Sequence, residues 1–512
     1  MSAPLRLTLV VAVLAAGLAG WALGGYIGAA AGLVIALLLV VIPWRGQQVW
    51  SWIGLFLRRK RPIVLEEPVT VANDRSGGGV RYQDGVAAVA VQVLGKAHTP
   101  TLFTGAATTY TENTLDIAEL RGLLHQSLGL RIESMSVVTL GARRRTTGDY
   151  PRVYDTMIGP PPYAGQRETW VIARIPALPN ADALQWRLTA GTAAVAAAQR
   201  ISAALRRNGI RARVATSTDI LELERRLGKV ALDPGRQQWR SVRGDGGWLT
   251  TYWYRAKDIS TDVLAQAWSM RADAIIQNIT LFPDGTATGT VTVRTAQPLD
   301  AAPAVILRTL PGEQATALAA GMCGPTVRLR SIRPGPAPAS LSVGIGPSGV
   351  LLGKVGAGDR LMLPFSDPGE FSRIHIAADD NLAKRLVVRT LGAGDRVTVH
   401  TRDTSRWASV RMPDIVVTDR PRPAPGTTVS VVDGPLAPAP RPNTVISVGP
   451  PGEPHRGHAD VLITQIGPAL VEVNAAGRTY TVEIELFRAE NRYVSSEPMS
   501  MMSAPEFADE RR

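Results

Sequence analysis

LTLVVAVLAAGLAGWALGGYIGAAAGLVIALLLVVIPW, residues 7–44, is the stretch that decides how this chain is organised, because none of its residues is charged. A bilayer core about 30 Å thick is crossed by one helix of about 20 apolar residues. The stretch is about twice that length, so we predict two transmembrane helices, at about 7–24 and 26–43. Gly24-Gly25 is the predicted turn, since glycine adopts positive φ without steric cost. A cleaved signal peptide over 1–25 is the disfavoured alternative, because a second apolar segment follows at once.

Positive charges flank the apolar stretch on both sides, and none lies in the predicted turn. Arg6 precedes the stretch, and Arg45 and the basic run 58–61 follow it. The side of a membrane that carries the positive loops is the cytoplasmic side. We therefore predict a protein of the inner (plasma) membrane with both termini in the cytoplasm, and with a cytosolic body after residue 61.

The segment RGQQVWSWIGLFLRRKR, residues 45–61, follows the anchor directly. Its aromatic and aliphatic residues and its basic end are typical of a helix that lies on an anionic membrane surface. A helix packed on the protein body is an equally weighted alternative. The residues predicted at the membrane interface are Trp44, Arg45, Trp50, Trp52, Arg58, Arg59, Lys60 and Arg61.

Length and composition set limits on the cytosolic part. The chain has 512 residues, a formal net charge of +13 and one cysteine, Cys323, so an intramolecular disulfide is excluded. The length is typical of about three domains. The basic residues are scattered along the chain, which favours a solvated surface near an anionic leaflet and argues against nucleic-acid binding.

The first cytosolic block, 62–230, alternates strand and helix patterns. Its long Ala-rich helix has apolar residues that recur every three or four positions, which indicates one buried face. The order is β-α-β-β-α-β, the ferredoxin-like pattern, and we predict an α/β (α+β) fold. The predicted strands are 86–93, 131–140, 169–175 and 210–215, and the predicted helices are 114–128 and 181–207.

The remaining chain is predicted to hold a second α/β block and then a β-rich part. The second block, 240–332, is predicted to repeat the ferredoxin-like order, with its last strand at 326–330. The later divisions are 341–418, a third block; 419–460, a Pro-rich and partly mobile connector; 461–494, an antiparallel β unit; and 495–512, a disordered tail.

One segment of the third block resembles a phosphate-binding loop. Ala378 to Arg385 follows a short strand and precedes a helix-like run, in the register G-x-x-x-x-G-K-[ST]. Ala378 and Ala383 replace both glycines, Arg385 replaces the hydroxyl that binds Mg²⁺, and only Lys384 remains. Alanine resists the positive φ of such a loop. The segment therefore predicts no nucleotide site, and it is either a degenerate remnant or a chance match.

No other pattern indicates a catalytic or cofactor site. Gly344, Gly346 and Gly349 match a dinucleotide fingerprint in spacing, but Pro347 and the strand-like residues after it favour a turn. His455 and His458 have a metal-ligand spacing without a third ligand nearby. We therefore predict no catalytic residue, no metal and no cofactor.

With these features in place, the chain resembles the EccE family, which are membrane components of the type VII (ESX) secretion systems of mycobacteria and related actinobacteria. The resemblance depends on the paired apolar helices, the W-x-W and RRKR motifs, RETWVIARIPALPNADALQWR (167–187), the helix that ends at Asn208-Gly209, and STDILELERRLG (217–228). It is best over 1–295.

The resemblance implies a non-catalytic subunit of a hetero-oligomeric membrane complex. EccB-, EccC- and EccD-like subunits and the lipid bilayer would be its partners, and the complex would export WXG-type and PE/PPE proteins. Two alternatives stay open: a membrane-anchored enzyme that binds a nucleotide or nucleotide sugar, and an envelope adaptor unrelated to secretion.

Overall fold

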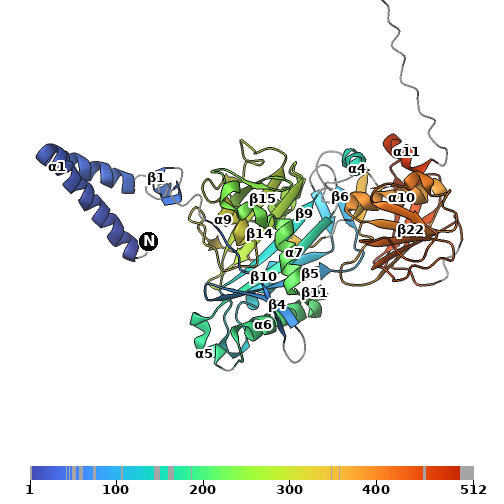
Figure 1. The fold of residues 1–512 in the computed structure, drawn as a ribbon, viewed down its shortest axis with the longest axis horizontal. Helices are drawn as coiled ribbons and strands as arrows, with labels where there is room; N and C mark the ends of the chain where they lie inside the picture. The colour runs from blue at the N-terminus through green and yellow to red at the C-terminus, as the bar shows by residue number, and fades with distance from the viewer. Residues whose placement is uncertain are drawn as a thin grey trace, which may run out of the picture.

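The computed structural model shows a mixed α/β protein with an apolar N-terminal helix and two large β-sheets (Figure 1). It describes residues 3–41, 43–44, 47–48, 54–56, 62–72, 77–104, 108–142, 150–158, 166–185, 187–346, 349–356, 358–453 and 457–495.

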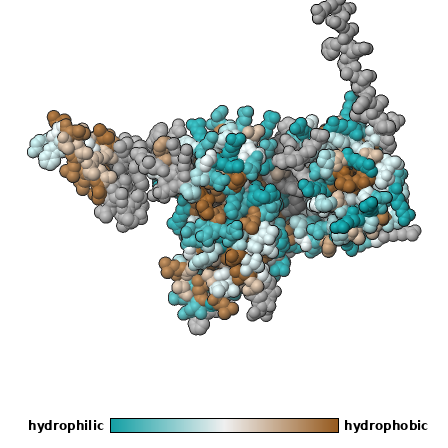
Figure 2. Space-filling model, viewed as in Figure 1, coloured by the Kyte–Doolittle hydropathy of each residue, from teal (hydrophilic) through white to brown (hydrophobic). Residues whose placement is uncertain are grey.

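The helix α1 (Ala3–Val41) is bent in its middle. Gly24 and Gly25 have non-helical dihedral angles, and the φ of Gly25 is 58°. A Cβ on Gly20 would lie 2.2 Å from the carbonyl oxygen of Gly28, so the parts before and after the bend pack closely against each other. Val10–Leu38 is the one stretch of the described chain that is long and apolar enough to cross a membrane. Its hydrophobic residues gather on α1 at the left of Figure 2, whereas much of the body surface is hydrophilic.

The segment after α1 does not form the predicted amphipathic helix where it is described. Pro43–Trp44 (β1) pairs with Gln47–Gln48 (β2) as a short antiparallel hairpin. Pro43 lacks a backbone N–H and disfavours helix continuation, which accounts for the break. Residues 54–56 form a helical turn; Leu55 is buried, and the Phe56 ring lies 6.2 Å from that of Trp239. This turn therefore packs on the body. The predicted interface residues Arg45, Trp50, Trp52 and Arg58 to Arg61 lie outside the described residues.

The first sheet joins both predicted α/β blocks. Its order is β12-β13-β15-β14-β9-β10-β5-β4-β3, with β11 also paired to β5. The blocks meet where β14 pairs antiparallel with β9. The strands are β3 (Val69–Ala72), β4 (Gly77–Gln83), β5 (Val86–Gly95), β9 (Ser134–Ala142), β10 (Gln166–Pro176), β11 (Arg211–Val214), β12 (Val242–Gly244), β13 (Gly247–Tyr254), β14 (Ala274–Leu281) and β15 (Thr286–Thr295), with β16 (Arg308–Thr309) and β17 (Gly335–Pro336) added beside β13 and β15.

Helices cover both faces of the first sheet. One face packs against α3 (Ile117–Gly122), α6 (Ala190–Arg207) and α8 (Thr261–Gln266). The other packs against α7 (Ser217–Leu227) and α9 (Gln314–Ala320). Alternate residues of the buried strands serve the two faces, as β geometry requires. Both layers together bury the sheet's central strands, of which β5 is buried along its whole length.

Three predicted elements of these blocks differ from the structure. The predicted helix 114–128 is instead a strand, β8 (Thr114–Asp116), followed by α3, because Asp116 caps a helix that begins at Ile117. The predicted helix 181–207 is split into α5 (Ala181–Leu184) and α6, because Thr189 starts α6 with its own capping box. The predicted strand 326–330 is a loop.

The second sheet combines a parallel and an antiparallel part. Its order is β23-β22-β24-β25-β21-β26-β27-β28-β19-β20-β6-β7. The strands from β23 to β26 in this order are parallel. The bounds are β6 (Thr101–Thr104), β7 (Thr108–Thr111), β19 (Val350–Val355), β20 (Asp359–Leu363), β21 (Ser372–Ala377), β22 (Val397–Thr401), β23 (Ile415–Thr418), β24 (Val429–Asp433), β25 (Thr444–Gly449), β26 (Val461–Gln465), β27 (Leu470–Ala475) and β28 (Arg478–Ile484).

Helices α10 (Asp380–Ala393), α4 (Tyr150–Ile158) and α11 (Asn491–Val494) pack together beside this sheet. The N-terminal block contributes α4, β6 and β7 to this part of the molecule, and β8 pairs with β18 (Ser342–Gly344). Segments far apart in sequence thus tie the two sheets together.

The Pro-rich segment 419–460 is more than a connector. It contains β24 and β25, two central strands of the parallel sheet, in which Val429, Val431 and Ile446 are fully buried. Short β-branched runs between the prolines supply these strands, and composition alone hid them. The strands predicted in 461–494 are present as β26, β27 and β28. The tail 496–512 lies outside the described residues.

Candidate functional site

The phosphate-loop-like segment does lie between a strand and a helix. Strand β21 ends at Ala377, and Asp379 caps α10 by accepting a hydrogen bond of 2.8 Å from the Leu382 N–H. Lys384 is fully buried, and its Nζ lies 2.6 Å from the Asp380 carboxylate. The helix start therefore carries two carboxylates where a phosphate would need free N–H groups.

The carboxyl ends of the parallel strands are closed by an internal ion-pair network. Arg406 donates to Asp380 at 2.6 Å and to Asp433 at 2.9 Å, and Trp407 donates to Asp433 at 2.7 Å. Burial raises the pKa of Asp380, but Lys384 and Arg406 outweigh it and hold this pKa below its ordinary value. Ligands of open α/β sheets bind at this edge. Here the chain's own side chains occupy it.

The remaining residue of the segment, Arg385, faces the interior. It donates to Glu490 at 2.7 Å, and Arg389, one turn later, donates to the same carboxylate at 2.8 Å and 3.0 Å. The Tyr150 hydroxyl of α4 also donates to Glu490, at 2.6 Å. Burial of Glu490 raises its pKa, but Arg389 outweighs this effect and lowers the pKa overall. The cluster holds α10, α11 and α4 together, which is a structural role.

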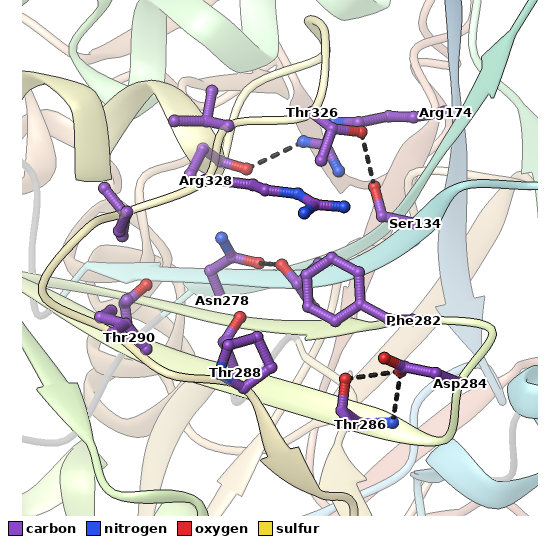
Figure 3. A pocket seen from close by; sticks show the side chains of 16 residues that line it. Ser134, Arg174, Asn278, Phe282, Asp284, Thr286, Thr288, Thr290, Thr326 and Arg328 are labelled. Carbon is purple, nitrogen blue, oxygen red and sulfur yellow. Dashed lines mark hydrogen bonds between the residues drawn. The ribbon is translucent and has the colours of Figure 1, made fainter. Parts of the chain in front are cut away.

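An open polar pocket lies on the first sheet instead (Figure 3). Its volume is about 200 Å³. The floor is formed by hydroxyl-bearing residues of β9, β14 and β15, and the loop after α9 covers one side. The residues that face it and are labelled in Figure 3 are Ser134, Arg174, Asn278, Phe282, Asp284, Thr286, Thr288, Thr290, Thr326 and Arg328.

Two arginines give this pocket its electrostatic character. Arg174 is fully buried, and it donates to the Ser136 hydroxyl at 2.7 Å and to the carbonyls of residues 320, 322 and 324 at 2.8 to 3.0 Å. All these acceptors are neutral, and burial lowers the pKa of Arg174 to about 10. Arg328 is exposed, and its side chain extends into the pocket in Figure 3.

Two carboxylates at the pocket, Asp284 and Glu133, accept hydrogen bonds from its lining residues. Asp284 accepts hydrogen bonds from the Thr286 N–H at 2.9 Å and the Thr286 hydroxyl at 2.6 Å, within its own turn. Glu133 accepts from the Thr326 hydroxyl at 2.7 Å. The pocket offers hydroxyl and guanidinium donors to an anion, with the carboxylates of Asp284 and Glu133 close to them.

No motif in the sequence marks this pocket. The signal that could have found it is the alternation TATGTVTVRT in β15, which places threonines 286, 288 and 290 on one face. Arg174 and Arg328 come from distant positions, and only the fold brings them to that face.

The glycine and histidine motifs are not assembled into a binding site in the part of the chain that the structure describes. Gly344 pairs in β18, whereas Gly349 lies before β19 in a different sheet, so the three glycines do not form a single strand–helix turn. His455 lies outside the described residues, and His458 lies 3.7 Å from Asp460. No group of three potential metal ligands occurs among the residues that the structure describes.

Comparison with known proteins gives concordant matches. A family model described as "Putative type VII ESX secretion system translocon, EccE" matches residues 163–254. The ESX-2 secretion system protein EccE2 of Mycobacterium tuberculosis (strain CDC 1551 / Oshkosh) is 52% identical over 506 residues, which cover 94% of each chain. The ESX-1 protein EccE1 of the same strain is 26% identical over 72% of this chain and 77% of its own length. EccE1 of Mycolicibacterium smegmatis is 24% identical over 73% of this chain and 76% of its own length.

Proposed function

This chain belongs to the EccE family of type VII (ESX) secretion proteins, and we propose that it is a non-catalytic structural subunit of such a system's inner-membrane complex. The observation that carries the proposal is the 52% identity to a protein named for ESX-2 secretion, over 94% of both chains. The ion pairs at the carboxyl edge of the parallel sheet support the non-catalytic part, since they occupy the position where ligands bind in related architectures.

We propose that α1 crosses the membrane as two antiparallel helices, with both termini in the cytoplasm. The bend at Gly25 supports this topology, and so do the close contacts of Gly20 with Gly28 and of Gly32 with the Ala16 carbonyl. Small residues let helix backbones approach closely in a bilayer. At about 1.5 Å per residue, the helical residues 3–23 span about 31 Å and residues 26–41 about 24 Å, so the first half matches a bilayer core of about 30 Å and the second half is shorter than it.

The two-helix anchor can be tested with a leucine at Gly20. Its Cβ would meet the Gly28 carbonyl at 2.2 Å, so the two halves would have to separate. We expect disulfide cross-linking between cysteines at positions 16 and 32 to fall several-fold. Gly24→Ala is the matched control, because nothing lies within 4 Å of its Cβ. Equal cross-linking in both variants would contradict the paired arrangement.

We propose that the first block, 62–230, is a ferredoxin-like unit and that 240–332 is a partial repeat of it. The order β11-β5-β10-β9, with all pairs antiparallel, supports the first unit. In the second block β13, β15 and β14 follow the equivalent order, and β12 and β16 take the place of a fourth strand. The remaining divisions of the chain, 341–418 and 461–494, then build the second sheet around the strands of 419–460.

We propose that EccB-, EccC- and EccD-like subunits are the partners, and that the first block meets the EccC or EccD cytosolic part. Exposed leucines of this block support a contact surface: Leu128, Leu178 and Leu188 are 69%, 88% and 93% exposed. Their segments are tied together, since Asn180 accepts from the Arg131 N–H at 2.7 Å and Arg187 donates to the Ser127 carbonyl at 3.2 Å. Exposed apolar groups that gather on one surface are typical of interaction sites.

The decisive experiment is a mild-detergent pull-down of the tagged full chain from its own membranes, read by mass spectrometry. Recovery of EccB-, EccC- and EccD-like proteins is the expected result, and a chain recovered alone would overturn the subunit proposal. In the Leu178→Ser/Leu188→Ser variant we expect several-fold less EccC or EccD. Val305→Ser is the control, because Val305 is 94% exposed in the second block. Equal recovery of EccC and EccD with both variants would contradict the proposed contact surface but not the subunit proposal.

A further inference from the structure

The Thr-rich pocket on the first sheet lies next to the place where the chain leaves the body for the anchor. Arg328 lines this pocket and also the neighbouring cavity into which Leu55 packs. Arg330 lines the same Leu55 cavity, and its Nη1 would lie 3.4 Å from a Cβ on Gly54. The pocket and the docked turn 54–56 therefore share one face of the body.

The connection between this face and α1 is short. Twelve residues, 42–53, separate the end of α1 from Gly54, and a fully extended chain of that length spans at most about 45 Å. The pairing of β1 with β2 shortens this reach. If α1 lies in the membrane, as proposed above, the face that carries Arg328 and Arg330 can rest on the cytoplasmic leaflet.

The pocket itself is built for an anion. The Arg328 guanidinium extends into the cavity (Figure 3), where it attracts the Asp284 carboxylate electrostatically, but no salt bridge or hydrogen bond to it is present among the described residues. Below it lies the buried charge of Arg174, whose acceptors are all neutral. Hydroxyls of Thr288 and Thr290 line the same cavity and can donate to an oxyanion. Asp284 at the pocket's edge is bonded within its own turn.

We propose that this pocket binds the phosphate of an anionic phospholipid headgroup from the cytoplasmic leaflet. The proposal rests on the membrane anchoring proposed above. Arg328 would contact the phosphate, and the threonine hydroxyls would complete its shell of donors. The pocket volume of about 200 Å³ accommodates a headgroup phosphate and its immediate substituents, while the acyl chains remain in the bilayer. Binding would hold the body in a fixed orientation beneath the anchor.

Native mass spectrometry of the full chain in mild detergent tests the proposal. Phosphatidylglycerol and phosphatidylcholine are titrated separately, and bound lipid is counted by mass. We expect wild type to retain phosphatidylglycerol in preference to phosphatidylcholine. Arg328→Gln should weaken phosphatidylglycerol binding about tenfold, as expected for one lost charge-assisted contact. Thr288→Val, which keeps charge and size, should weaken it by a smaller factor.

Arg308→Gln is the matched control, because Arg308 is an exposed arginine of β16 that does not line the pocket. Equal loss of lipid in Arg308→Gln and Arg328→Gln would contradict the proposed site, because lipid binding would then depend on the net charge of the chain. Displacement of the lipid by an equal concentration of inorganic phosphate would overturn the headgroup assignment. A chain missing from the membrane fraction would contradict the anchor proposal itself, whereas these lipid outcomes bear only on the pocket.

Discussion

Arg174 of the first sheet and Arg389 of α10 are both fully buried, yet their surroundings differ in one respect. Arg174 donates to carbonyls and a hydroxyl, all neutral. Arg389 donates to carbonyls too, but also to both oxygens of Glu490, at 3.0 Å and 2.8 Å. Burial lowers the pKa of Arg174 to about 10. Burial also lowers the pKa of Arg389, but Glu490 outweighs it and raises that pKa overall.

The two arginines differ in that Arg389 is hydrogen-bonded to a carboxylate, whereas Arg174 has only neutral hydrogen-bond acceptors and a through-space attraction to Glu133. In the second sheet every arginine of the α10 segment finds a carboxylate from the same chain, and the ligand edge is closed in the same way. In the first sheet a buried cation lies beneath an open pocket that holds a second guanidinium. A binding function toward anions is therefore expected of the first sheet, and a structural role of the second.

Removal of Glu490 is the change we expect to have the largest effect. In Glu490→Ala the guanidinium groups of Arg385 and Arg389 would stay buried without their shared carboxylate. Breaking a buried ion pair from one side costs about 3–5 kcal/mol. Denaturant unfolding of the full chain in detergent should show a loss of that size.

Glu222→Gln is the control for this measurement. Its ion pair with Arg225 is exposed, with side chains 45% and 72% accessible, so its loss should change stability by less than about 1 kcal/mol. If Glu490→Ala were as stable as Glu222→Gln, the buried ion pairs of Glu490 would contribute little to the free energy of unfolding.

Arg174→Met should have the next largest effect. The substitution keeps much of the buried volume but leaves the carbonyls of residues 320 and 324 without their donor, whereas the Met322 carbonyl keeps the Gly324 N–H. Each buried acceptor left unsatisfied costs about 1–3 kcal/mol, and water entering from the pocket offsets part of this, so we expect a total of about 2–3 kcal/mol. Hydrogen exchange should rise in the loop 321–334. Unchanged exchange there would contradict the anchoring role of Arg174.

Much of the first sheet could be predicted from the sequence because its signals are local. The buried β-branched run of β5 and the apolar face of α6, which recurs every three or four residues, are readable without tertiary context. The opposite holds for two other segments: the sequence left the juxtamembrane segment open between the membrane surface and the protein body, and it did not reveal the strands of the Pro-rich segment. Leu55 and Phe56 could face a membrane or a protein surface alike, and only the fold shows that Leu55 is buried and that the Phe56 ring lies beside Trp239.

The polar clusters could not be predicted because their members are far apart in the chain. Glu490 reaches Arg385 across 105 residues, and Arg174 reaches Gly324 across 150 residues. The segment around Lys384 lies between a strand and a helix, as its sequence predicts. Its internal partners Arg406 and Asp433 carried no sequence signal.

Lys384→Met should lower the free energy of unfolding by an intermediate amount. Lys384 is fully buried and paired with Asp380, which Arg406 also contacts, so Asp380 keeps one cationic partner after the change. We expect a loss of about 1–2 kcal/mol in unfolding experiments, and no nucleotide binding in either wild type or variant. Saturable nucleotide binding that depends on Lys384 would instead favour the enzyme alternative.

Acid should weaken the second sheet through Glu490. Its pKa in the folded protein lies below the ordinary value of about 4.3, so its ion pairs contribute stability above that value and lose it as pH falls through the folded pKa. We expect the stability difference between wild type and Glu490→Gln to be constant from pH 7 to about 5 and to shrink below about pH 4. A difference that grows toward low pH would contradict the depressed pKa.

Arg328→Gln should have the smallest effect on stability. It therefore tests most strictly whether the pocket of the first sheet differs from the structural ion pairs of the second. Arg328 is exposed, and it attracts the exposed Asp284 carboxylate without forming a salt bridge in the described chain, so its loss should change the free energy of unfolding by less than about 0.5 kcal/mol. Arg174→Met, in the same pocket, should cost several times more. A side chain that is kept for folding would destabilise the chain when removed, whereas one available for an external anion would not. A large loss in Arg328→Gln would therefore assign both arginines to the fold and remove the distinction between the two sheets.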